Sequence, residues 1–94
     1  MRVTNANEAI EFVTTNARGV AEPKPRALAE TVARAIASRY EHLSTWGHVL
    51  SINERYDMHQ AIGVLRLEHF RLTGRAWLPE TPAQEADKAR AERA

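Results

Sequence analysis

The chain has 94 residues, of which 44% are hydrophobic and 27% charged, and it contains no cysteine. This length suits one small domain with a single core and leaves little room for a deep substrate cleft, and the lack of cysteine excludes disulfides and thiolate metal sites. Thirteen basic and twelve acidic residues give a net charge of +1, far from the strong positive bias of a dedicated nucleic-acid binder.

The beginning of the sequence, MRVTNANEAIEF, lacks the uninterrupted apolar stretch of a signal peptide. No later window approaches the roughly 18 apolar residues that a membrane span requires. We therefore expect a cytoplasmic protein that does not associate with membranes.

The first predicted helix begins at Asn5, because Asn5 and Glu8 have the spacing of a capping box, and it ends at Gly19. The following segment, residues 20–26, contains two prolines and is predicted to be a connector within one domain. One narrow apolar stripe runs along this helix and consists of Ala6, Ala9, Ile10, Val13 and Ala17.

A second helix is predicted to start near Pro25, since proline suits the first helical turn. Arg39 lies inside its apolar stripe, so we expect the stem to cover apolar surface while the guanidinium reaches water. Pairing with a buried carboxylate or contact with a partner are the alternatives. The stripe itself comprises Leu28, Val32, Ala35, Ile36 and Leu43, with Tyr40 at its margin.

The third predicted helix runs from a capping box at Ser51 and Glu54 to Gly74 and has two apolar sides. In a monomer it would be sandwiched between the first two helices and the segment 76–78, whereas in an oligomer one side could pack against another chain. One stripe comprises Met58, Ile62, Leu65, His69 and Leu72; the other comprises Ile52, Tyr56, Gly63, Leu67 and Phe70.

The last segment, TPAQEADKARAERA, has Thr81 as an N-cap, Pro82 in the first turn and alanines as its only apolar residues. Such a segment has little to bury. The predicted fold class is therefore all-α, a small bundle of three main helices with a short or frayed C-terminal helix. Residues 1–80 would form a single domain, and residues 81–94 a projecting or frayed tail.

No residue pattern indicates catalysis or metal binding. The four histidines, at positions 42, 48, 59 and 69, include no pair four residues apart, and His69 is expected to be a packed, hydrogen-bonded core residue. The sequence has neither a Gly-x-Ser-x-Gly elbow nor a Gly-rich phosphate loop. We therefore expect no enzyme activity, no metal and no cofactor.

The main functional hypothesis is a regulator or inhibitor that binds a protein partner, or itself, through an apolar helix face. It depends on the two apolar sides of the third helix and on two tryptophans, a residue type enriched at interface hot spots. Core filling is the alternative role of the tryptophans. The partner-binding candidates are Trp46, Tyr56, Gly63, Leu67, Phe70 and Trp77.

The alternative hypothesis is RNA or DNA binding through arginines spaced along one edge of the third helix and at its C-terminal end: Arg55, Arg66, Arg71 and Arg75. The stretch 54–78 resembles the core of ANTAR domains, and this resemblance implies a helical RNA-binding module of bacterial antitermination regulators. It covers about a quarter of the chain and is carried by Arg55, Gln60, Ala61, Gly63, Val64, Leu65, Thr73, Ala76 and Trp77.

Overall fold

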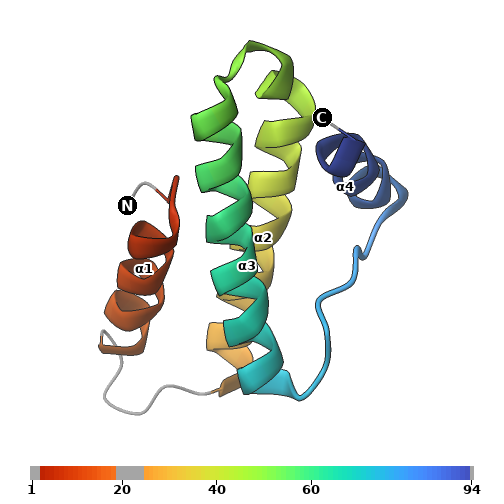
Figure 1. Cartoon of the computed structure of the whole chain (residues 1–94). Helices are drawn as coiled ribbons and strands as arrows, with labels where there is room; N and C mark the ends of the chain where they lie inside the picture. The colour runs from red at the N-terminus through yellow and green to blue at the C-terminus, as the bar shows by residue number, and fades with distance from the viewer. Residues whose placement is uncertain (1–2, 19–24, 94) are drawn as a thin grey trace.

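Two long antiparallel helices form the centre of the molecule. In the computed structural model, which describes residues 3–18 and 25–93, α2 spans Pro25–Trp46 and α3 spans Ile52–Thr73, and the short 3-10 turn η1 (Gly47–Val49) joins them. The helix α1 (Ala6–Arg18) packs against α3, and α4 (Pro82–Arg93) packs against α2. The helices therefore follow one another across the molecule in the order α1, α3, α2, α4 (Figure 1). The described residues include no strand, which confirms the predicted all-α fold.

Local capping signals determine where these helices begin and end. At the start of α3, the Glu54 backbone N–H donates to Ser51 Oγ at 3.1 Å, and the Ser51 backbone N–H donates to Glu54 Oε1 at 3.2 Å. The helix ends at Gly74, whose φ of 71° is a left-handed conformation that glycine adopts without a steric penalty. The start of α2 at Pro25 is also as predicted. The predicted stop of the first helix at Gly19 lies outside the described residues.

The first and last helices use a variant of the predicted cap. The Asn5 side chain accepts from the Glu8 backbone N–H at 2.9 Å, but the Glu8 carboxylate accepts from the backbone N–H of Thr4. At α4, Thr81 Oγ1 accepts from the Gln84 backbone N–H, and Gln84 Oε1 accepts from the backbone N–H of Glu80. In both helices the returning side chain therefore reaches one residue further back than a capping box requires.

The hydrophobic core lies mainly between α2 and α3. The predicted stripe of α2 is buried, as are Met58, Ile62 and Leu65 from the first stripe of α3, whereas His69 and Leu72 are half-buried. No polar or charged residue is buried in the part of the chain that the structure describes. The core consists of Val3, Ala9, Leu28, Val32, Ala35, Ile36, Tyr40, Leu43, Met58, Ala61, Ile62, Leu65, Trp77 and Ala91.

Arg39 ties the segment before α1 to α2. Its Nε donates to the backbone carbonyl of Val3 at 3.2 Å, and its Nη1 donates to the carbonyl of Ala35 at 3.1 Å. Burial lowers the pKa of this guanidinium. The side chain stays half-exposed, and two of its nitrogens bind backbone carbonyls, which the sequence did not predict; among the described residues no buried carboxylate is its partner.

The C-terminal helix is short, as predicted, but it packs on α2 and does not project from the bundle (Figure 1). Ala91 has no exposed surface, and Arg90 Nε donates to Ser44 Oγ of α2 at 2.6 Å. The predicted lack of a docking side overlooked that alanine, which buries little area, lets two helix backbones approach closely.

Candidate functional site

One side of α3 carries exposed apolar residues toward both ends of the helix, and the turn between Tyr56 and Gly63 contains His59 and Gln60. Ile52, Tyr56, Leu67 and Phe70 have exposed fractions of 76%, 63%, 74% and 55%, and Gly63 lies exposed among them. Successive helical residues are rotated by about 100°, so these residues share one side while Met58, Ala61, Ile62 and Leu65 share the other. We call the set Ile52, Tyr56, Gly63, Leu67 and Phe70 the α3 face.

The α3 face is the second stripe predicted for this helix, and no described segment covers it. The prediction that α3 is central is confirmed, since α1 and α2 both pack against it. The prediction that the segment 76–78 covers its other side is wrong, because Trp77 turns to α2 and stacks on Tyr40. Leu78, the next residue, is exposed. In the monomer only one of the two apolar sides of α3 is therefore buried.

A groove between α1 and α3 continues the α3 face sideways. Its volume is about 1000 Å³. Ile10 belongs to the apolar stripe predicted for α1, and 54% of it is exposed at this groove, while Ala9 of the same stripe is completely buried. The exposure of Ile10 was not predicted from the sequence. Ile10 and Ala9 belong to the same apolar stripe, and helical periodicity alone does not show which of the two is buried. The groove is lined by Ile10, Val13, Thr14, Val64, Leu67, Glu68, Phe70 and Arg71.

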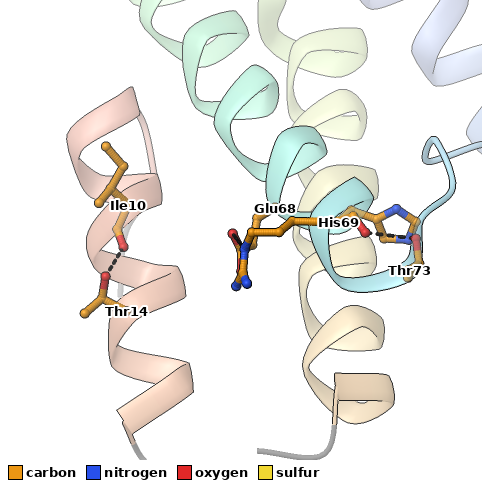
Figure 2. A network of polar contacts seen from close by, with 6 residues as sticks. Ile10, Thr14, Glu68, His69 and Thr73 are labelled. Carbon is orange, nitrogen blue, oxygen red and sulfur yellow. Dashed lines mark hydrogen bonds and ion pairs between the residues drawn. The ribbon is translucent and has the colours of Figure 1, made fainter.

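The polar groups of the groove have partners within the chain. Thr14 Oγ1 donates to the carbonyl of Ile10 at 2.8 Å, and Arg71 Nε donates to Glu68 Oε2 at 2.9 Å. The hydrogen bond that Arg71 donates to the Glu68 carboxylate raises the pKa of Arg71, and so does the negative charge of that carboxylate. Figure 2 shows Ile10 and Thr14 on α1, with Glu68 on the side of α3 that is turned toward them. The Thr14 hydroxyl can therefore be covered by an apolar ligand without losing its partner, whereas the exposed Arg71 guanidinium, which uses only Nε and Nη2 on Glu68, belongs at the solvated edge of the groove.

The two tryptophans lie in different environments. Trp77 is only 3% exposed, and its ring stacks on that of Tyr40 with 5.4 Å between centroids, so it fills the core. Trp46, at the C-terminal end of α2, is 52% exposed. Of the two, Trp46 alone is accessible to a partner, and it belongs to α2 rather than to the α3 face.

Two of the four candidate arginines for nucleic-acid binding are engaged within the chain. Arg66 Nη1 donates to the Tyr40 hydroxyl at 3.1 Å, and Arg71 forms an ion pair with Glu68. Arg75 is exposed and Arg55 is half-exposed. The structure therefore does not place the four guanidinium groups together as one free basic strip.

The His69 side chain points away from Glu68, toward the segment that follows α3 (Figure 2). Its Nδ1 is 3.2 Å from the carbonyl oxygen of Arg75, and the side chain is half-buried. Among the described residues, no three His, Asp or Glu side chains are grouped as a metal would require. Over the same residues, no helix has the length and apolarity needed to traverse a bilayer.

Comparison of the chain with models of protein families, with curated proteins and with solved structures gave no match. The similarity to ANTAR domains therefore depends only on the residues of the stretch 54–78. The geometry of the α3 face is the stronger basis for a functional proposal.

Proposed function

We propose that this protein is a non-enzymatic helical interaction module, a regulator or inhibitor in the cytoplasm, that binds a protein through the α3 face. The observation that carries this proposal is the exposure of more than half of each of its four large side chains, Ile52, Tyr56, Leu67 and Phe70. Large exposed apolar side chains gathered on one side of a helix in a small protein favour an interaction site.

The size of the surface supports the proposal. Together with Ile10, the large side chains of the α3 face expose on the order of 600 Å², since a large apolar or aromatic side chain carries roughly 150–250 Å². This sum covers two groups of side chains, with Ile10, Leu67 and Phe70 at the groove and Ile52 and Tyr56 toward the start of α3, and the largest single patch on a typical monomer is about 300–600 Å². Aromatic residues, here Tyr56 and Phe70, are also enriched at the centres of protein interfaces.

The arrangement of charges also favours a protein partner. The α3 face carries no charged side chain, while Arg55 and the Arg71–Glu68 pair lie beside it. An apolar centre with a charged rim is the usual plan of a protein interface. RNA or DNA binding through the arginine edge stays the alternative prediction, with only Arg55 and Arg75 outside the contacts described above.

The test is quantitative affinity capture from an extract of the native cells, carried out in parallel with and without nuclease treatment. The baits are the wild-type chain, Leu67→Glu and the matched control Ala83→Glu, which adds the same charge at an exposed position of α4. We expect proteins that bind the wild type and Ala83→Glu but not Leu67→Glu. Equal capture by all three baits would contradict the proposal, and capture that nuclease abolishes would favour the alternative.

A further inference from the structure

Gly63 lies in the middle of α3, and no contact among the described residues of the monomer requires a glycine at this position. Glycine is the least favourable helix-interior residue after proline. A Cβ built on Gly63 meets no atom within 4 Å, so no described neighbour requires the small side chain. Its backbone is helical and does not have the positive φ found at Gly74. The missing side chain instead leaves a shallow dip in the middle of the α3 face.

Two aromatic residues stand at equal distances from this dip. Tyr56 lies seven residues before Gly63 and Phe70 seven residues after it, and both are exposed on the same side. Seven residues are two helical turns, or about 10 Å along the axis. Two crossing helices approach most closely at one point and separate on either side. Glycine fits the crossing point, and large rings fit the widening space beyond it.

We infer that the α3 face binds the α3 face of a second copy of this chain, with the two helices crossing at Gly63. This inference rests on the proposed function and names the partner. The equal spacing of Tyr56 and Phe70 lets glycine meet glycine and ring meet ring in either relative direction of the helices, while Leu67 meets Leu67 only when the helices run parallel. Such self-complementarity is what a two-fold symmetric interface requires.

Charge and area are consistent with this occupant. None of the five residues of the α3 face is charged. His59 and Arg66 border the face within about one turn of Gly63, and the guanidinium of Arg66 already donates to the Tyr40 hydroxyl, so the charge at the crossing point has a partner within its own chain. The roughly 600 Å² exposed by its large side chains and Ile10 approaches the 800 Å² or so that each partner buries in an interface of standard size. The groove residues of α1 beside the face would add to this area.

Sedimentation velocity of the purified full chain tests the inference directly. From micromolar to millimolar concentration, the mass of the wild type should rise from one chain, 10.6 kDa, to two chains. Leu67→Glu should keep the mass of one chain throughout, since dimerisation would bury its charge, whereas Ala83→Glu should follow the wild type. Circular dichroism establishes that each variant is folded, and the exposure of Leu67 leads us to expect that it is.

Cysteine cross-linking locates the contact, and the natural chain contributes no thiol of its own. Gly63→Cys should form a disulfide-linked dimer on mild oxidation, and the exposed control Ala83→Cys should not. A wild type that stays monomeric at millimolar concentration, or a Leu67→Glu variant that dimerises as the wild type does, would overturn the inference. If the wild type is monomeric but Leu67→Glu still loses captured proteins, the partner is a different protein and the proposed function stands.

Discussion

The ring of Trp77 stacks on the ring of Tyr40 with 5.4 Å between centroids and 26° between planes, and this contact attaches the segment between α3 and α4 to the core. The hydroxyl of the same Tyr40 accepts a hydrogen bond from Arg66 of α3. Tyr40 therefore contacts one neighbour through its ring face and another through its hydroxyl, so that α2, α3 and the following segment meet at one residue.

Removal of the Trp77 ring should destabilise the fold. Trp77 is buried, so Trp77→Ala should lower the free energy of unfolding by about 3–5 kcal/mol through lost burial and cavity formation. Chemical denaturation followed by circular dichroism measures this. The matched control is Trp46→Phe at the exposed tryptophan, which should change stability by no more than about 0.5 kcal/mol. Equal losses in the two variants would show that Trp77 has no special place in the core.

The two sides of α3 should respond differently to the same truncation. Leu65 has no exposed surface, and Leu67, two residues later, is 74% exposed. Leu65→Ala should cost about 2–5 kcal/mol of folding stability, whereas Leu67→Ala should cost less than about 1 kcal/mol, because it removes little buried area. Thermal and urea unfolding measure the free energy of unfolding of both variants relative to the wild type. A large loss from Leu67→Ala in dilute solution would mean that the α3 face is covered within the monomer.

Substitution of alanine for glycine should have opposite signs at two positions of the chain. Gly63→Ala should stabilise the monomer by about 1 kcal/mol, since the added methyl group meets open space and alanine favours the helix. Gly74→Ala should destabilise it by roughly 1–2 kcal/mol, because its φ of 71° strains a residue with a Cβ. Both are measured in the Leu67→Glu background, so that self-association does not contribute. A loss of stability from Gly63→Ala there would reveal an internal contact.

The docking of α4 should depend on the small size of one alanine. Ala91 is completely buried, so Ala91→Leu should lower stability by about 1–3 kcal/mol through overpacking. The exposed Ala83 offers a matched control, since Ala83→Leu on the same helix should be nearly neutral. Denaturant titration of the two variants distinguishes a docked α4 from a projecting one. Equal unfolding midpoints for Ala91→Leu and Ala83→Leu would mean that α4 projects, as the sequence predicted.

The sequence predicted the features of this fold that depend on local signals. The start of α2 at Pro25, the Ser51 cap of α3 and its Gly74 stop follow from residues within one helical turn of each end. The buried stripe of α2 follows from helical periodicity, because a wide apolar face in a small protein has to be buried.

The features that the sequence did not predict depend on contacts between distant segments. Arg39 donates to the carbonyl of Val3, 36 residues earlier, and Arg90 donates to Ser44, 46 residues earlier. Periodicity identified the α3 face as apolar but did not determine whether it was covered, because coverage depends on where the segment 76–78 packs. The apolar ring of Trp77 could be buried against either α2 or α3, and in the structure it stacks on Tyr40 of α2.

The spatial order α1, α3, α2, α4 implies an order of events along the folding pathway. The central pair, α2 and α3, is joined only by η1 and its flanking residues, so its contacts close a short loop. The contacts of α1 with α3 span the intervening α2, and those of α4 with α2 span the intervening α3. We expect the α2–α3 hairpin to form the folding nucleus, with the outer helices adding after the rate-limiting step. Stopped-flow chevron plots should then show Ile62→Ala slowing refolding, while Ala91→Leu accelerates unfolding and leaves the refolding rate almost unchanged.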